Sequence, residues 1–339
     1  MVIATIVTLS IPNPGLSLPL SPGDRLKVSI PEGELFNGIY LVNIDGTLQI
    51  PYLPPIQVSG QELPQIEQVL SKTLIEKGLF NPRFLQVTIQ PIEWAAVVVN
   101  VSGETFEPGR LLLNERSPEA LARNTQASGD YPPGRFLTAA IREAGGVMPN
   151  ADIKNIRLIR NGQETTIDLS GVLKGEEVQD IPLVAGDRIV VPDLKKIQPE
   201  LVRPSQITIP GVRVFLSNLT QPASSNSGAS VNKDATSFVY GSRLSHAVIA
   251  GNCAGGSTNN ANRRALLVRT DRLTGSTLVI ERPIEDLLRK PNDDAKNPFL
   301  MPDDGIACYD SKTTNLKGVA DTLGTIFSPF SLLLNLFRK

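Results

Sequence analysis

Short apolar runs separated by turn residues predict a chain made of many short β-strands. Residues 25–30 alternate between polar and apolar side chains, as a half-buried strand does. Residues 39–42 and 47–51 flank Asp45-Gly46, and Asp-Gly between two strands is typical of a β-hairpin. Residues 84–89 form another alternating run, which we expect to be the closing strand of a first sheet.

One early segment has helical rather than strand periodicity. Its apolar positions at the spacing of one helix face are Ile66, Val69, Leu70 and Leu74. Gly78 follows them and is suited to end the helix. The order of strands, helix and strand predicts a first domain at residues 18–95.

A second domain is expected at residues 96–195. The predicted strands are residues 97–101, 110–113, 156–160, 165–169 and 188–191. One short helix, residues 137–141, ends at Gly145-Gly146, and the polar residues 115–134 form a surface insertion. The turn signals around these elements are Gly103, Pro108, Gly109, Asn161-Gly162 and Gly186-Asp187.

The same order of elements returns in residues 205–311, which predicts a third domain. Its expected strands are residues 207–209, 212–216, 265–269 and 277–280. Its helix, residues 244–249, ends at Gly255-Gly256, and residues 220–236 have the composition of a flexible loop.

The second and third domains align as an internal repeat. The matched positions are Leu137 with Leu244, Ala144-Gly145-Gly146 with Ala254-Gly255-Gly256, Leu158 with Leu267 and Asp187 with Asp304. A two-fold repeat is typical of scaffold or binding architecture rather than of a single active site. The alternative is a pair of unrelated β-rich domains that share common turns.

One aspartate turn occurs in each domain. Pro22-Gly23-Asp24 stands before the first strand, and Asp187 and Asp304 stand before the last strands of the repeats. We interpret these carboxylates as caps of backbone amides in turns. A catalytic carboxylate cluster is the alternative, but with one aspartate in each domain nothing in the sequence brings them together.

Composition argues against several functional classes. Lys and Arg number 33 against 34 for Asp and Glu, so no basic excess points to nucleic acid. A single histidine, His246, and two cysteines are too few for a dedicated transition-metal site. The sequence contains no phosphate-loop, HExxH or GxSxG motif, so we expect no cofactor, no metal and no catalytic residues.

Both ends of the chain carry apolar segments. Residues 2–11 are too short to span a bilayer but have the length of a signal-peptide core. Residues 1–17 are therefore either the remnant of an export signal or an ordinary first strand.

The last segment, residues 315–339, predicts an amphipathic helix. Its apolar stripe consists of Leu323, Phe327, Phe330, Leu334 and Phe337. The stripe favours contact with a membrane or a pore, and the alternative is packing on the β-rich domains.

Several of these motifs resemble those of a known family. Residues 20–28 and 45–60, which include the Pro22-Gly23-Asp24 turn and Gly46, are similar to the N-terminal domain of the outer-membrane polysaccharide export family. Residues 101–109 and 137–146 and the Gly186-Asp187 turn resemble its SLBB module, a β-grasp fold that binds soluble ligands. The third domain resembles a second, more diverged copy of that module.

The resemblance implies a fold class and a role. The fold would be α+β, with mixed small sheets and single helices: an export domain, two β-grasp-like SLBB modules and a C-terminal amphipathic helix. The protein would be a homo-oligomeric ring subunit in the periplasm and outer membrane. It would carry polysaccharide across the periplasm and outer membrane. Its expected partner is an inner-membrane polysaccharide copolymerase.

A second class of function stays open beside that one. β-Grasp folds host many functions, so the chain could be a soluble periplasmic glycan- or ligand-binding protein without a pore. The apolar stripe in residues 315–339 favours the channel, since a soluble binder has little use for it.

An exported protein meets an oxidising compartment, which bears on the two cysteines. Cys253 and Cys308 both lie in the third domain and are the only cysteines of the chain. We expect a disulfide between them, with two separate buried thiols as the alternative.

Overall fold

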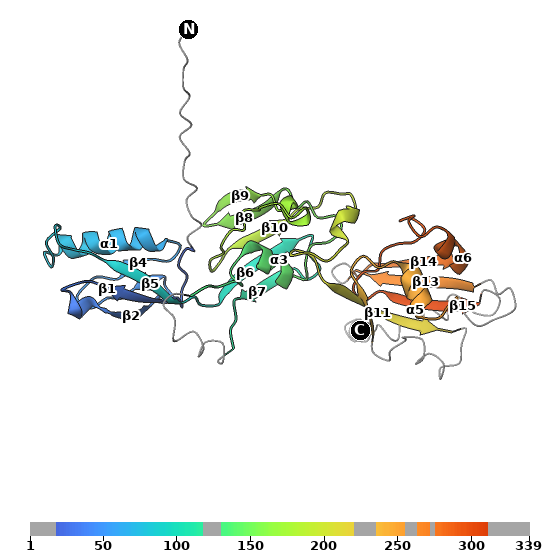
Figure 1. Cartoon of the computed structure of the whole chain (residues 1–339), viewed down its shortest axis with the longest axis horizontal. Helices are drawn as coiled ribbons and strands as arrows, with labels where there is room; N and C mark the ends of the chain where they lie inside the picture. Colours follow the sequence, from blue (N-terminus) through green and yellow to red (C-terminus); the bar gives the residue numbers. More distant parts are fainter. Residues whose placement is uncertain (1–17, 118–129, 220–234, 255–262, 272–274, 311–339) are drawn as a thin grey trace, which may run out of the picture. The chain divides into compact units, whose positions relative to one another are not determined.

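The computed structural model describes residues 18–117, 130–219, 235–254, 263–271 and 275–310. The chain forms two compact units (Figure 1). The first contains residues 1–201 and 206–208, and the second contains residues 202–205 and 209–339. Each unit is described by itself below.

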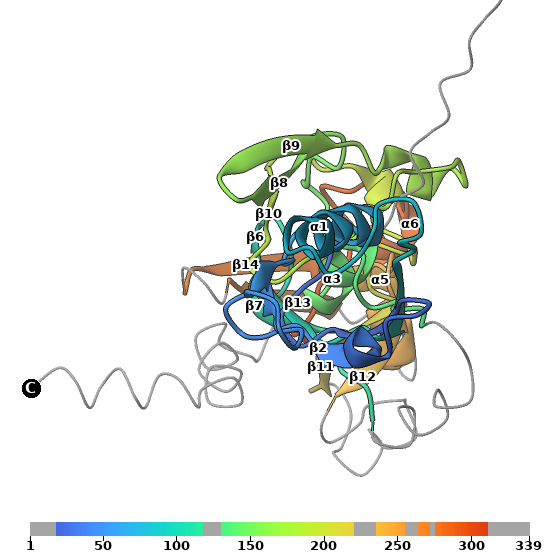
Figure 2. The same cartoon turned by 90° about the vertical axis from the view of Figure 1, so that its left-hand side faces the viewer.

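Residues 18–95 of the first unit, which we call the export module after the family resemblance, form a small sheet covered by one helix. Three antiparallel strands lie in the order β2 (Gly38–Leu41), β1 (Arg25–Ser29) and β5 (Thr88–Glu93). Helix α1 (Leu63–Glu76) buries Ile66, Leu70 and Leu74 in the same core as Leu26 and Val28. Figure 2 shows α1 above β2 in this module. The remaining pieces are a 3₁₀ turn (Glu34–Phe36) and the paired strands β3 (Thr47–Leu48) and β4 (Ile56–Gln57).

The rest of the first unit, which we call the first β-grasp module, is a five-stranded sheet with a short helix. The strands, in spatial order, are β7 (Gly109–Leu113), β6 (Val97–Gly103), β10 (Arg188–Val191), β8 (Ile156–Arg160) and β9 (Gln163–Ile167). The first strand β6 and the last strand β10 pair in parallel at the centre. Helix α3 (Leu137–Glu143) packs Leu137, Ala140 and Ile141 against the sheet. A further 3₁₀ turn (Ser170–Leu173) follows β9, and another (Pro199–Leu201) ends the module.

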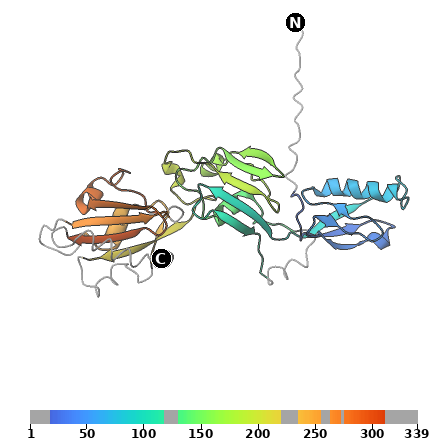
Figure 3. The ribbon, with the colours of Figure 1, turned by 180° about the vertical axis from the view of Figure 1, so that it is seen from behind.

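The second unit, which we call the second β-grasp module, repeats this topology. Its strands, in spatial order, are β12 (Thr236–Val239), β11 (Gly211–Asn218), β15 (Gly305–Asp310), β13 (Arg263–Thr270) and β14 (Thr277–Pro283). Helix α5 (Leu244–Ala250) takes the place of α3, and α6 (Ile284–Arg289) is added after β14. Figure 3 shows both sheets from behind. In each sheet the first and last strands of the module are parallel central neighbours.

Backbone hydrogen bonds give the exact correspondence of the two modules. Leu137 and Leu244 both begin the helix, and their N–H groups donate to Ile181 and Pro298 respectively. After the helix, the N–H of Gly146 donates to Ile141 at 2.9 Å, and that of Cys253 donates to Val248 at 3.0 Å. Gly146 therefore corresponds to Cys253.

The expected glycine register of the repeat is wrong. Gly145 has φ 74°, and the corresponding position is Asn252 with φ 52°. Asparagine tolerates this left-handed conformation, so the helix ends without a glycine pair. Helix α5 ends at Ala250, before the predicted Gly255-Gly256, which lie outside the described residues.

Three strand predictions also differ from the structure. Strand β5 starts at Thr88, while Leu85 and Val87 only pack against the core and Phe84 is exposed. Residues 207–209 form no strand, although Ile207 is buried. Strand β12 begins at Thr236, at the end of the segment expected to be loop.

The hairpin predicted around Asp45-Gly46 is reduced to a turn. Strand β2 pairs with β1 and strand β3 pairs with β4, so the two flanking strands do not share a ladder. They are linked by a single bridge between Val42 and Leu48.

The fold class is α+β, as predicted: small sheets, two of them mixed, with few helices. Among the residues described, none of the helices has the length and apolar character needed to cross a membrane. The predicted C-terminal helix, with Leu323, Phe327, Phe330, Leu334 and Phe337, lies outside them, as do residues 1–17.

Gly103 offers a test of the central strand pairing. It has φ +89°, and a Cβ there would lie 2.0 Å from the carbonyl oxygen of Val191 on β10. Gly103→Ala should therefore lower the free energy of unfolding by about 3 kcal/mol in chemical denaturation. Gly162→Ala is the control, since φ is +79° but nothing lies within 4 Å. It should cost only about 1 kcal/mol, and equal losses would contradict the clash.

Candidate functional site

The three aspartate turns share one geometry. In each, the Oδ2 atom accepts a hydrogen bond from the backbone N–H three residues earlier. The three contacts are Ser21 to Asp24 at 2.7 Å, Val184 to Asp187 at 2.9 Å and Met301 to Asp304 at 2.8 Å. All three carboxylates are buried, so they cap their turns away from water, as the sequence led us to expect.

Each turn also binds an arginine that the sequence analysis did not identify. Arg160 donates from Nε and Nη2 to both oxygens of Asp187, at 2.9 and 2.7 Å. Arg269 does the same to Asp304, at 2.8 and 2.7 Å. Both arginines come from the strand next to the turn in their own module, β8 or β13. Such forked pairs are stronger and more directional than neutral hydrogen bonds.

Asp24 is bound differently, because its arginine comes from another module. Nη1 of Arg135, just before α3, donates to Oδ1 of Asp24 at 2.7 Å, and both side chains are 0% exposed. Nη2 of Arg135 donates to Ser21 Oγ at 2.8 Å and to the carbonyl of Pro19 at 3.2 Å. Its Nε donates to the carbonyl of Leu183 at 3.3 Å. The guanidinium thus joins the export module to the first β-grasp module.

This cluster corrects the expectation that nothing brings the aspartates together. Burial lowers the pKa of Arg135, and the charges of Asp24 and Asp187 both oppose that shift, so they act on the same guanidinium. Ser21 Oγ also accepts a hydrogen bond from the N–H of Ala185, in the Asp187 turn, at 3.1 Å. Two of the three turns therefore meet at this junction, while Asp304 lies in the second unit.

Burial dominates the electrostatics of the junction. Removal from water raises the pKa of Asp24 despite the opposing charge of Arg135, and the same removal lowers the pKa of Arg135. Both shifts mean that desolvation outweighs the attraction between the two groups. Such a pair holds its geometry firmly because losing either partner leaves the other charge buried alone.

The connection between β5 and β6 is fixed by the same network. The N–H of Ala95 donates to Oδ1 of Asp24 at 2.8 Å. The backbone N–H and the indole N–H of Trp94 donate to Asp130, at 2.8 and 3.0 Å. The Arg135 guanidinium lies over the Trp94 ring, 5.3 Å from its centroid. This short connection is therefore hydrogen-bonded both to the export module, through Asp24, and to the first β-grasp module, through Asp130.

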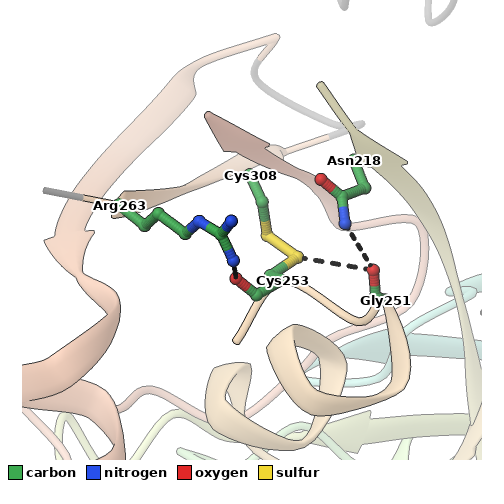
Figure 4. Close-up of a disulfide and its surroundings, with 5 residues drawn as sticks. All are labelled: Asn218, Gly251, Cys253, Arg263 and Cys308. Atoms are coloured by element: carbon green, nitrogen blue, oxygen red, sulfur yellow. Dashed lines mark hydrogen bonds between the residues drawn. A yellow bond between two sulfur atoms is a disulfide. The ribbon is translucent and has the colours of Figure 1, made fainter. Parts of the chain in front are cut away.

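A disulfide joins Cys253 and Cys308 in the second β-grasp module (Figure 4). It ties the end of α5 to the central strand β15, with 5.9 Å between the Cα atoms. Asn218 Nδ2 donates to the carbonyl of Gly251 at 2.8 Å, and Arg263 Nη1 donates to that of Cys253 at 3.0 Å. The two cysteines thus share one buried contact rather than lying apart as separate thiols.

The remaining predicted turn residues have backbone roles. Positive φ angles occur at Gly23, Gly46, Gly103, Gly145, Gly146 and Gly186. Pro22 precedes Gly23 in the first turn, while Pro108 leads into β7, which begins at Gly109. His246 is held in the first turn of α5, where its Nδ1 accepts the N–H of Arg243 at 3.2 Å.

The described part of the chain contains no cluster of three His, Cys, Asp or Glu residues able to hold a metal ion. The buried carboxylates identified above are each held by an arginine and a backbone N–H. They are therefore already engaged in structural contacts rather than poised for acid–base chemistry.

Comparison with known families agrees with this architecture. Residues 14–90 match the model of the polysaccharide biosynthesis/export protein family, and residues 134–191 match the SLBB domain. The chain is thus similar to polysaccharide export proteins over its first domain and to SLBB domains over its second. The matched export family is not a family of enzymes.

Curated proteins similar to this chain include two named EPS I polysaccharide export outer membrane protein EpsA. The one from Ralstonia nicotianae is 27% identical over 184 residues, which cover 52% of this chain and 43% of the relative. The one from Ralstonia solanacearum is 24% identical over 174 residues, which cover 50% and 41%. The matched segments thus span less than half the length of these relatives.

Removing Arg269 should make the second module lose stability as the pH rises. Arg269→Met leaves Asp304 buried near Asp303 without its arginine partner, and should cost about 3 kcal/mol. Burial already raises the pKa of Asp304, so folded protein holds the proton at pH values where the unfolded chain has lost it. Stability measured by denaturation should therefore fall as pH rises above about 4.

Arg289→Met is the matched control for that experiment. Arg289 pairs with Glu285 at 2.7 Å on the surface of α6, where both side chains are more than 70% exposed. An exposed pair of this kind contributes about 0.5 kcal/mol or less. A pH dependence equal in the two variants would show that Asp304 does not depend on Arg269.

The disulfide should stabilise the second module alone. It closes a loop with a sequence separation of 55, so the Cys253→Ala/Cys308→Ala variant should lose about 2–4 kcal/mol. Thermal unfolding with and without reductant measures this loss, and the first unit should melt unchanged. Thiol labelling of unreduced, denatured protein should find no free thiol, and two labelled thiols would contradict the pairing.

Proposed function

We propose that the chain is a non-catalytic subunit of an oligomeric channel in the cell envelope. The channel exports capsular or extracellular polysaccharide across the periplasm and outer membrane. The observation that carries this proposal is the order of an export domain followed by an SLBB module, joined by a buried ion pair. The names of the relatives, both polysaccharide export outer membrane proteins, support the cargo and the location.

Exposed apolar side chains on edge strands support assembly into a homo-oligomer. In the second module Val239 lies on edge strand β12, and Leu278 and Val279 lie on edge strand β14. In the export module Ile39 and Leu41 lie on edge strand β2. An unpaired edge with apolar side chains is a ready partner for another strand or copy. Repeated modules would present similar edges around a closed ring.

Scaffolding accounts for the buried charges better than catalysis does. Each aspartate fixes a turn, and the arginines fix the aspartates. Polysaccharide would be handled by the assembled ring rather than by a reactive site in one subunit. An inner-membrane polysaccharide copolymerase is the partner that would deliver the chain of sugars, as the family resemblance implies.

Residues 315–339 would supply the membrane contact. Burying each large apolar side chain of the stripe contributes about 1.5–3 kcal/mol. The two cores of the first unit are built without residues 315–339, so contact with lipid or neighbouring subunits is where this segment would gain most. Leu334→Asp places a charge on the stripe and should weaken that contact.

Deletion of residues 315–339 tests the proposal. The truncated protein should keep its modules folded, because the described cores end before this segment. It should lose membrane association and fail to restore surface polysaccharide in an export-deficient host. Light scattering in detergent should give a ring-sized mass for the full chain.

Three results would contradict the channel. A monomeric mass for the full chain in detergent, at high concentration, excludes a ring. A truncated protein that melts earlier yet stays on membranes shows that the tail packs on a module. A monomer that binds glycan would instead support the soluble binding protein.

A further inference from the structure

Comparison of the three turns shows that one of them lacks an arginine of its own. Asp187 and Asp304 are each bound by an arginine on the adjacent strand of the same sheet. Asp24 is equally buried, but its arginine is supplied across the junction by Arg135. The export module thus carries a buried carboxylate whose charge is matched only when the first β-grasp module is in place.

The position of Arg135 has an exact counterpart in the second module. The N–H of Leu183 donates to the carbonyl of Arg135, and the N–H of Leu300 donates to that of Ser242. Both residues stand two positions before their helices, α3 and α5. The second module therefore has a short serine where the first has the guanidinium.

The second group that contacts the export module, the backbone N–H of Ala185, is also missing from the second module. Ala185 donates its N–H to Ser21 Oγ, and it stands second in the Val184–Asp187 turn. The same place in the Met301–Asp304 turn is Pro302, which has no N–H to donate. Both groups that hold the export turn are thus specific to the first module, and neither is needed to build a β-grasp sheet.

We propose that the first β-grasp module carries a recognition site for the aspartate turn of the export module, with Arg135 as its anchor. The site takes a Ser-Pro-Gly-Asp turn: Arg135 binds the carboxylate and Ser21, and the Ala185 N–H binds the same hydroxyl. Its occupant is the chain's own export module, which it fixes as one rigid body with the first β-grasp module. The second module, with Ser242 and Pro302, has no such site.

The chemistry makes this contact all-or-none. Separation would leave Asp24 without a charged partner and Arg135 with only the charge of Asp187, which already pairs with Arg160, so both would have to be hydrated at once. The bonds that Trp94 donates to Asp130 would break in the same step. A partly opened junction would bury unmatched charges, which is the costliest arrangement.

Trp94 is the only tryptophan, so its fluorescence reports on this junction in the full-length protein. The test replaces each contact residue by the residue that the second module has at the same position. The variants are Arg135→Ser, Ala185→Pro and the two changes combined. The emission of the double variant should shift to the red, and acrylamide should quench it more strongly. Arg135→Lys should keep part of the protection, because it retains the charge but not the fork.

A distance measurement separates opening from unfolding. Spin labels at Lys72→Cys on α1 and Lys174→Cys after the first module's hairpin should give a narrow distance distribution in the parent protein. The double variant should broaden it, while the amides of β1 and β6 keep their protection from hydrogen exchange. Arg142→Ser is the control: it makes the same replacement at an exposed position of α3 and should change none of these signals.

Two outcomes would overturn the proposal. Unchanged quenching and an unchanged distance distribution in the double variant would mean that other contacts hold the modules together. Loss of amide protection in β1 or β6 would mean that Arg135 serves the folding of a module rather than its docking. Ala185→Pro alone leaves no charge unpaired. A broadening of the spin-label distance distribution in that variant, smaller than in the double variant, would therefore support the site independently.

Discussion

A carboxylate removed from water requires a positive partner at hydrogen-bonding distance, and this constraint organises each of the three described modules. Asp24, Asp187 and Asp304 each shape a turn from which a core strand starts, and each depends on one arginine. Two arginines lie inside the sheets that they stabilise. The third, Arg135, lies across a junction, so the same interaction builds modules and joins them.

Most of the fold could be predicted from local sequence patterns, because strand alternation, turn glycines and helical spacing each depend on residues that are close together in the chain. The shift of the strand expected at residues 84–89 follows from packing, because Leu85 and Val87 face the core without joining the ladder. The glycine register failed because Asn252 adopts the left-handed conformation that Gly145 has in the first repeat. An alternating pattern therefore predicts which side chains are buried, but not that they belong to a strand. A glycine is only one of the residues that can form such a turn.

The junction could not be predicted in the same way. Asp24 and Arg135 are 111 residues apart, and no periodicity links them. A turn sequence predicts that its aspartate accepts a backbone N–H, but not which distant cation balances the charge. The repeat did contain a usable signal: Arg160 and Arg269 occupy matching strand positions, whereas the first turn has no such neighbour.

The parallel pairing of first and last strands has a consequence for how such chains can grow. In each five-stranded sheet these strands run side by side in one direction, so the chain enters a module at one end and leaves at the other. A module of this kind can be added to or removed from a tandem array without re-pairing strands in its neighbours. Gene duplication can therefore lengthen the array while the sheets already present keep their strand pairing.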